Sequence, residues 1–365
     1  MIMTRRQMLG AATALCLTGA SSAKARDTAG FDGAIQTAFD AAETPALGGM
    51  VVGPDGALWT GVRGLRHAGD DAAATRDDLW HLGSNTKAMT AALYGRLVDQ
   101  GRASWTDTLS TLLPGVTMND VWRDVPMTHV MGHRAGLSDA TALGRDWLMT
   151  ARADPRPLPE QRLALVATML GSPPAGTPGT FAYANANYIL IGAIIERLTG
   201  ASWEDAMRAE LFGPLGITTG GFGAPRGDQP WGHSGGQGID PSGPVTDNPA
   251  ALGPAGTVHM TLQDYGRFLR VFLSDGAGWL RPETLAVLMQ PVGEGQPPYA
   301  GGWIVPPGQP WAQGVCLTHD GSNTMWYAST WVAPGIGKAF VAVSNDAQRG
   351  RPACQTLIPG LIQAI

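Results

Sequence analysis

Cysteine is scarce in this chain of 365 residues, which contains only Cys16, Cys316 and Cys354. No cluster of cysteines is present, so the sequence does not indicate a cysteine-ligated zinc site. Cys316 and Cys354 could form one disulfide in an oxidising compartment. Their spacing does not show whether they lie close together, so this pairing stays open.

Other features are also missing. Basic residues number 25 against 30 acidic ones, so nothing indicates binding to nucleic acid or to an anionic membrane surface. No phosphate-binding glycine loop is evident. His129 and His133 are four residues apart but lack the glutamate of the zinc-protease pattern, and they are better explained by loop or core packing. We therefore expect no metal and no cofactor.

The first 25 residues predict an export signal. Arg5 and Arg6 precede a mildly apolar stretch, residues 8–20, that is too short to cross a bilayer, and the pattern resembles a twin-arginine signal. Ala23-Lys24-Ala25 fits a cleavage site. Cleavage there removes three basic and no acidic residues, which moves the formal charge from −5 to −8. We expect a bacterial protein of the periplasm or the medium, with no integral membrane segment after cleavage.

A serine and a lysine three residues apart begin an apolar helix. Ser84-Asn85-Thr86-Lys87 precedes residues 88–98, which have high helix propensity and are followed by Gly101. Residues three apart share a helix face, so the Lys87 amine can lie beside the Ser84 hydroxyl. Lysine can activate a serine near neutral pH only if its surroundings lower its pKa from ~10.4. In isolation, an N-cap serine followed by a surface lysine explains the pattern better.

A second string, Tyr183-Ala184-Asn185, lies on a predicted loop. A Pro/Gly-rich segment, residues 173–179, precedes it, and an apolar helix, residues 189–198, follows. Loops held between fixed elements often carry catalytic groups. A tyrosine near a lysine ammonium can have a lowered pKa and relay protons, and the Asn185 amide can orient substrate or lysine. Alone, Tyr183 would be interpreted as a tyrosine packed at a helix entrance.

A third string, His319-Asp320-Gly321, lies in a predicted strand, residues 314–321, that precedes two more strands at 325–332 and 338–344. A cation at His319 could bind a carboxylate or carbonyl of a substrate. Gly321 would let a substrate approach the backbone closely. The Ser322 N–H could join the Ser84 N–H in an oxyanion hole. A lone histidine in a strand is more often structural, so this assignment depends on the other two strings.

In this order, the three strings resemble those of the serine β-lactamase and penicillin-binding-protein superfamily. The matches are SxxK at 84–87, Tyr-x-Asn at 183–185 and Lys/His-x-Gly at 319–321. The chain is most similar to the class C β-lactamase-like branch, which also includes DD-carboxypeptidases, D-aminopeptidases and carboxylesterases. The resemblance extends from about Phe31 to the end of the chain.

The resemblance implies a role for each residue. Ser84 would be the acylated nucleophile and Lys87 its general base. Tyr183 would relay a proton to the leaving group and then from the attacking water. Asn185 would help to orient the site, and the backbone amides of Ser84 and Ser322 would hold the oxyanion.

One departure from the family pattern concerns substrate recognition. This chain has His319-Asp320 where β-lactamases and transpeptidases usually have a lysine followed by a hydroxyl residue. Histidine is only partly protonated near neutral pH, although an adjacent aspartate favours the protonated ring. We therefore expect weaker recognition of a free carboxylate, which disfavours efficient penicillin hydrolysis and favours an esterase or a peptidase of other specificity.

A rival motif is also present. Gly232-His233-Ser234-Gly235-Gly236 satisfies GxSxG, the nucleophile elbow of α/β-hydrolases. That elbow needs a strand immediately before it and a helix immediately after it. Residues 225–231 and 237–241 predict neither, so we interpret the motif as a glycine-rich loop that could border the substrate cleft.

The predicted fold class is α/β (α+β), with an antiparallel sheet flanked by helices and an inserted, mostly helical lobe. The first helix and two strands are predicted at residues 31–42, 49–52 and 57–63, and a terminal helix at 354–365. The α/β lobe would comprise approximately residues 26–82 and 257–365. The helical lobe would comprise approximately residues 83–256, with the active site between the two.

The favoured function is an exported serine hydrolase that acts through an acyl-enzyme on an ester or amide. D-amino-acid peptides, β-lactams and carboxylic esters are its candidate substrates, so the partner is a small molecule or a peptide. The alternative is a catalytically idle ligand-binding or sensor protein on the same scaffold. The sequence leaves open the natural substrate, the deacylation rate and the oligomeric state.

Overall fold

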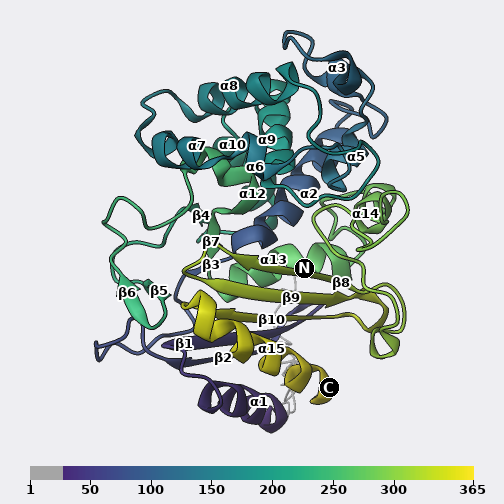
Figure 1. The fold of residues 1–365 in the computed structure, drawn as a ribbon. Helices are drawn as coiled ribbons and strands as arrows, with labels where there is room; N and C mark the ends of the chain where they lie inside the picture. The colour runs from purple at the N-terminus through teal and green to yellow at the C-terminus, as the bar shows by residue number, and fades with distance from the viewer. Residues whose placement is uncertain (1–27) are drawn as a thin grey trace, which may run out of the picture.

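The C-terminal strands pair with the N-terminal ones in a computed structural model that describes residues 28–365 (Figure 1). The predicted signal peptide, residues 1–25, lies outside the described residues. The strands are β1 (Ala46–Gly53), β2 (Gly56–Gly64), β3 (Trp80–His81), β4 (Gly221–Phe222), β5 (Gly232–Ser234), β6 (Gln237–Ile239), β7 (Val258–Met260), β8 (Leu317–Ser322), β9 (Tyr327–Ala333) and β10 (Lys338–Ser344).

Helices account for most of the middle of the chain. They are α1 (Ala29–Asp40), α2 (Thr86–Asp99), α3 (Leu109–Leu112), α4 (Asp120–Arg123), α5 (Met127–Met131), α6 (Asp139–Ala142), α7 (Arg145–Thr150), α8 (Leu158–Gly171), α9 (Asn185–Thr199), α10 (Trp203–Ala206), α11 (Gly213–Leu215), α12 (Gly253–Gly256), α13 (Leu262–Leu273), α14 (Pro282–Met289) and α15 (Ala347–Gln363). No helix within residues 28–365 is both long enough and apolar enough to cross a membrane.

The main sheet has the strand order β2-β1-β10-β9-β8, and all its pairs are antiparallel. Helices α1 and α15 cover one face, and α13 packs on the other (Figure 1). Successive side chains of a strand point to opposite faces. In β1, Leu47 and Val51 accordingly enter the core under α15, whereas Met50 and Val52 enter the core shared with the helical part. The predicted fold class, an antiparallel sheet with flanking helices, is confirmed.

Two buried helices form the centre of the helical part. Helix α2 packs against α9 and α12, and both α2 and α9 are buried over most of their length. At Gly192, an added Cβ would lie 2.2 Å from Pro254 Cγ, so glycine is what allows α12 to approach α9 this closely. This close packing places the backbone carbonyls of α12 beside the first turn of α2.

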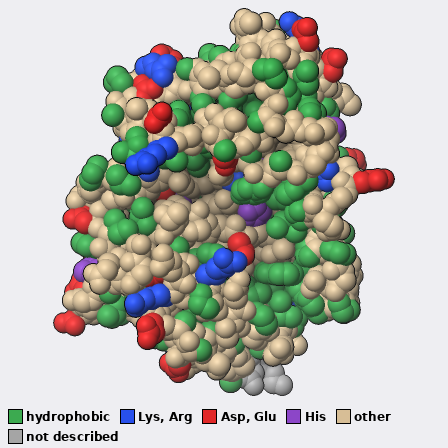
Figure 2. All heavy atoms as spheres, viewed as in Figure 1, with side chains coloured by type: hydrophobic (Ala, Val, Ile, Leu, Met, Phe, Trp, Pro, Cys, Tyr) green, Lys and Arg blue, Asp and Glu red, His purple; other side chains and the backbone are tan. Residues whose placement is uncertain are grey.

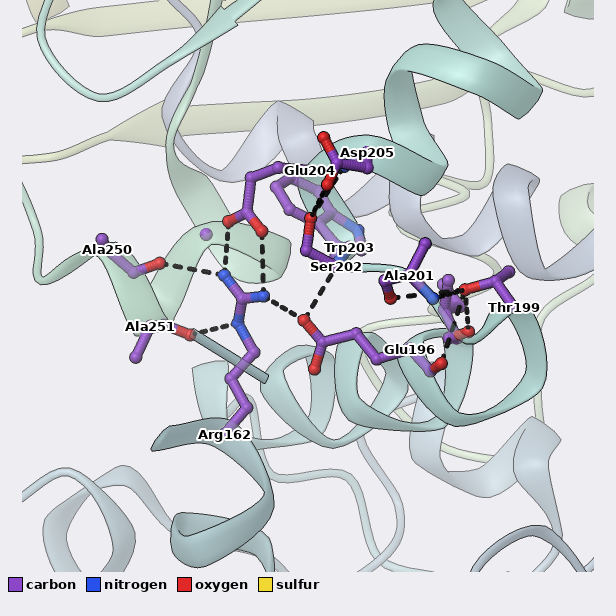
Figure 3. Close-up of polar contacts among 12 residues, drawn as sticks. Arg162, Glu196, Thr199, Ala201, Ser202, Trp203, Glu204, Asp205, Ala250 and Ala251 are labelled. Carbon is purple, nitrogen blue, oxygen red and sulfur yellow. Dashed lines mark hydrogen bonds and ion pairs between the residues drawn. The ribbon is translucent and has the colours of Figure 1, made fainter. Parts of the chain in front are cut away.

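A buried arginine joins four segments of the helical part (Figure 3). Arg162 of α8 is fully buried and donates hydrogen bonds to the carboxylates of Glu196 on α9 and Glu204 on α10. It also donates to the carbonyl oxygens of Ala250 and Ala251, at 3.1 Å and 3.0 Å. Charged partners and backbone acceptors compensate its desolvation. The arginine therefore fixes the turn that leads into α12.

Three sequence-based expectations about local structure were wrong. Helix α15 begins at Ala347, seven residues before the predicted start, because the Asp346 side chain caps it by accepting from the N–H groups of Gln348 and Arg349. The GxSxG segment forms strand β5 and the turn of the β5–β6 hairpin rather than an irregular loop, and His233 in β5 is buried. Strand β8 begins at Leu317, three residues later than predicted.

Both described cysteines, Cys316 and Cys354, are free thiols and are buried. They belong to different hydrophobic clusters, one beside Trp311 and the other under α15. The disulfide that the sequence left open is therefore absent from the described residues.

Candidate active site

Ser84 lies in a short 3₁₀ turn, Gly83–Asn85, that leads directly into α2. Gly83 has a left-handed φ of +51°, and a Cβ added there would lie 2.4 Å from the Ser322 nitrogen. A Cβ added at Gly321 would lie 2.1 Å from the Leu82 carbonyl oxygen. Because neither residue has a Cβ, the backbone of the nucleophile turn can pack directly against the backbone at the end of β8. The close approach that Gly321 permits here is made by the chain itself, and an approach of substrate to this residue stays a prediction.

The structure brings the serine, the lysine and the tyrosine together. Lys87 Nζ lies 2.9 Å from Ser84 Oγ, and the Tyr183 hydroxyl donates to the same oxygen at 3.0 Å. Ser84 comes from the turn before α2, Lys87 from α2 itself and Tyr183 from the residue pair before α9, nearly a hundred positions later in the chain. Figure 2 shows the surface hollowed between the helices and the sheet on this face.

Lys87 is fully buried, and two further oxygens surround its amine. Asn185 Oδ1 and the Ala255 carbonyl each lie 2.7 Å from Nζ. Desolvation lowers the pKa of Lys87 to about 7, although the negative charge of Asp139 acts in the opposite direction. A neutral amine can donate its two N–H bonds to Asn185 and Ala255, and its lone pair then faces the Ser84 hydroxyl.

Tyr183 is at the mouth of the site. Its side chain is 43% exposed, yet desolvation of its hydroxyl end raises the pKa above the ordinary value, against the lowering effect of the hydrogen bond to Ser84. The expectation that a neighbouring lysine lowers this pKa was therefore wrong. With a pKa of about 7, Lys87 is already neutral in the alkaline range where a tyrosine titrates, so burial dominates the pKa of Tyr183. Tyr183 is a neutral phenol that can donate and relay a proton.

Asn185 is the first residue of α9 rather than a loop residue. Its Nδ2 donates to Asp139 Oδ2 at 2.8 Å, and the Ala186 N–H donates to Asp139 Oδ1 at 3.0 Å. The Asp139 carboxylate can only accept hydrogen bonds, so it binds the NH₂ end of the Asn185 amide. The Oδ1 end of that amide is therefore directed toward Lys87. Sequence reasoning missed Asp139, since it lies 46 residues from Asn185 in a segment without a motif.

The Asp139→Asn substitution should lower the pKa of Lys87 below about 7, by up to about one unit, because it removes the negative charge that opposes desolvation. ¹³C-lysine NMR can follow the titration, since the chain contains only three lysines. The exposed Asp146→Asn variant on α7 is the control. A pKa that stays the same or rises would contradict this electrostatic role.

His319 is buried on β8, 6.1 Å from Tyr183 between ring centroids. Its Nδ1 lies 2.7 Å from the Asp320 carbonyl oxygen, and its Nε2 lies 2.9 Å from the Tyr299 hydroxyl. Desolvation and the nearby Lys87 lower the pKa of His319 to about 3, so the ring is neutral. The expectation of a partly protonated histidine was wrong.

The carboxylate of Asp320 does not offset this lowering of the His319 pKa, because the Asp320 side chain does not face the ring. Adjacent strand residues point to opposite faces of the sheet, and the Asp320 carboxylate accepts from the Tyr327 hydroxyl at 2.6 Å. His319 therefore offers a hydrogen-bonding surface beside Tyr183, but no positive charge. A groove of about 510 Å³ continues from Tyr183 and His319 toward Trp331 and Ile358 on the other side of β8.

The backbone nitrogens of Ser84 and Ser322 lie on either side of the contact between Gly83 and Gly321. The N–H and C=O of Thr318 bond to Ile304, so they point outward from the edge of β8. Because peptide groups alternate in direction along an antiparallel strand, the Ser322 N–H also points outward, toward Gly83. A Cβ added at Gly321 would lie 2.8 Å from the Ser84 nitrogen. The Ser84 and Ser322 nitrogens thus both lie beside the contact between Gly83 and Gly321, and their action as an oxyanion hole stays a prediction.

His133 packs against the ring of Tyr183. It is buried, its Nδ1 accepts the Ala184 N–H at 3.3 Å, and its ring lies 4.4 Å from that of Tyr183. Burial, Lys87 and His319 lower its pKa well below the ordinary value, so it is neutral. Within residues 28–365, no group of three or more histidine, cysteine, aspartate or glutamate side chains could hold a metal ion.

Comparison with known proteins agrees with this geometry. The family model described as Beta-lactamase matches residues 31–359. Penicillin-binding protein 4 of Amycolatopsis lactamdurans is 31% identical over 318 residues, which cover 81% of this chain and 80% of that protein.

Two solved structures show the same fold. The octameric penicillin-binding protein homologue from Pyrococcus abyssi aligns with a TM-score of 0.75 at 20% identity, over 93% of this chain and 77% of the other. A D-stereospecific amidohydrolase from Streptomyces sp. aligns with a TM-score of 0.71 at 22% identity, over 91% and 98% of the two chains.

Proposed function

Because the chain belongs to the Beta-lactamase family of serine hydrolases, we propose that it is an exported enzyme that forms an acyl-enzyme on Ser84. One observation carries the proposal: Ser84 Oγ lies within hydrogen-bond distance of both Lys87 Nζ and the Tyr183 hydroxyl. A nucleophile in contact with a base, and a base oriented by further groups, is the arrangement that activates a serine.

Acylation follows from the placement of these groups. The neutral Lys87 amine takes the Ser84 proton as Oγ attacks the substrate carbonyl carbon, and the N–H groups of Ser84 and Ser322 hold the resulting oxyanion. The intermediate collapses with cleavage of the bond to the leaving group. The proton passes from Lys87 through the Tyr183 phenol to the leaving nitrogen or oxygen. A water molecule then repeats the sequence and releases the acid.

The lack of a positive charge at His319 favours substrates without a carboxylate next to the scissile bond. A neutral His319 provides no cation for a carboxylate, and a charge-assisted hydrogen bond of that kind contributes about 1.5–3 kcal/mol. We therefore propose that esters and amides without a carboxylate next to the scissile bond react better than penicillins. The names of the relatives, a penicillin-binding protein and a D-stereospecific amidohydrolase, keep D-amino-acid amides among the candidates.

We also propose that the protein acts in the periplasm or outside a bacterial cell. The proposal is supported by Arg5 and Arg6, the apolar stretch that follows them and the Ala23-Lys24-Ala25 site. Fusion of residues 1–25 to a reporter that needs the twin-arginine route would test it, with Arg5→Lys and Arg6→Lys together as the control.

The function is tested with the protein lacking residues 1–25 and a fluorescent alkyl phosphonate. We expect one adduct, located on Ser84 by peptide mass spectrometry, and none in Ser84→Ala. A panel of short p-nitrophenyl esters, D-amino-acid amides and nitrocefin, followed by intact mass, then ranks the acyl donors. Equal labelling of Ser84→Ala, or no reaction of the unsubstituted protein with any of these compounds, would reject the proposal.

A further inference from the structure

A buried carboxylate connects the two segments that carry the oxyanion N–H groups. Asp247, on the loop between β6 and α12, is about 92% buried. Its Oδ2 lies 2.9 Å from His81 Nε2, and its Oδ1 accepts from Asn323 Nδ2 at 2.7 Å. His81 precedes the nucleophile turn, and Asn323 directly follows Ser322.

The hydrogen bonds on the nucleophile side determine the state of His81. The Gly83 N–H donates to His81 Nδ1 at 3.1 Å, so Nδ1 carries no proton. The ring proton is then on Nε2 and is donated to Asp247. The carboxylate thus fixes the tautomer that can accept from Gly83, the residue immediately before Ser84.

The second carboxylate oxygen of Asp247, Oδ1, binds the residue that follows the end of β8. Asn323 donates to Asp247, and its Oδ1 accepts the N–H groups of Met325 at 3.1 Å and Trp326 at 3.0 Å. This arrangement shapes the turn between β8 and β9 directly after Ser322. Asn323 is also buried, so these bonds are made away from water.

We propose that Asp247 is a positioning residue that sets the distance between the Ser84 and Ser322 N–H groups through His81 and Asn323. The inference rests on the proposed function and adds to it the group that builds the oxyanion hole. Catalysis by such a hole depends on donors that are held in place before charge develops. Among the described residues, the side-chain hydrogen bonds of Lys87 and Tyr183 go to Ser84, Asn185 and Ala255 and not to Asp247, His81 or Asn323.

Asparagine at position 247 cannot replace the carboxylate. With its NH₂ toward Asn323, it places donor against donor there. With its NH₂ toward His81, it opposes the Nε2 proton, and a change of tautomer only moves the conflict to the Gly83 N–H. In either orientation of the asparagine, one hydrogen bond of the network is lost. The segment on that side can then shift and move the Ser84 or the Ser322 N–H out of position.

The test compares Asp247→Asn with the unsubstituted enzyme on an activated ester and on the thionoester of the same acid. Sulfur accepts hydrogen bonds poorly, so an intact oxyanion hole favours the oxygen ester. We expect kcat on the oxygen ester to fall about 10- to 100-fold with KM within about twofold, and the ratio of oxygen to thiono rates to shrink. His81→Phe, which keeps the ring but removes both hydrogen bonds, should change the ratio in the same direction.

The control is Asp264→Asn, which perturbs a buried aspartate that accepts from Thr218 and Thr219 away from the site. It should leave the ratio unchanged, even if its melting temperature falls as much as that of Asp247→Asn. Phosphonate labelling of Ser84 in the unsubstituted enzyme separates the two proposals. With labelling present, an unchanged ratio in the position 247 and 81 variants overturns the positioning role alone. With labelling absent, both proposals fall.

Discussion

Replacing Lys87 with arginine should lower kcat/KM for ester hydrolysis by about 10³-fold, because a guanidinium stays protonated and cannot accept the Ser84 proton. Lys87→Met should cause a similar loss, since it removes the base without adding a charge. Stopped-flow acylation kinetics measure both. Lys338→Arg, on the outer end of β10, is the matched control and should remain active.

The same base predicts the pH profile of the unsubstituted enzyme. Lys87 must be neutral to act, and its pKa is about 7. Below that pH, kcat/KM should fall about tenfold for each unit, and above it the rate should level off. An acidic limb near pH 4, or the same limb in an active Lys87→Met variant, would assign the base to another group.

Replacing Tyr183 with phenylalanine should lower kcat by about 10²-fold. The substitution removes the hydroxyl that donates to Ser84 Oγ, while the ring contacts with His133 and His319 remain. The loss should be larger for amides than for p-nitrophenyl esters, because a poor leaving group needs the relayed proton more. Rates on a matched ester and anilide measure this difference.

Tyr94→Phe provides the control for Tyr183→Phe. Its hydroxyl is bonded to the Ser104 carbonyl at 3.0 Å, remote from the nucleophile. Both substitutions delete one phenolic oxygen, so equal activity of the two variants would deny Tyr183 a part in proton transfer.

Local patterns predicted most of the elements that place the nucleophile. The apolar residues after Ser84 predicted α2, and the spacing from Ser84 to Lys87 predicted a shared face. The last three strands were recognisable from the turn segments that separate them, residues 322–324 and 334–337. The start of α15 was missed because it depends on the Asp346 cap, a matter of side-chain geometry, and Pro352 lies inside the helix.

The charge state of His319 and the long-range contacts of the site could not be predicted from the sequence. His319 was predicted to be partly charged, but its burial against Lys87 and Tyr299 arises only when distant segments pack. Asp139 begins the four-residue helix α6 and Asp247 belongs to a loop, so neither lies in a long periodic pattern, and their partners are 46 and 166 positions away in sequence. No local signal in the sequence marks such contacts.

The two unpaired thiols bear on the proposed export of the protein. Cys316 and Cys354 are enclosed in separate clusters, and burial raises the pKa of each thiol, so little reactive thiolate forms. A chain threaded through a membrane unfolded would offer both sulfurs to periplasmic oxidants before the clusters close. The twin-arginine route proposed for residues 1–25 would carry the protein already folded. Both thiols would then stay buried during transport.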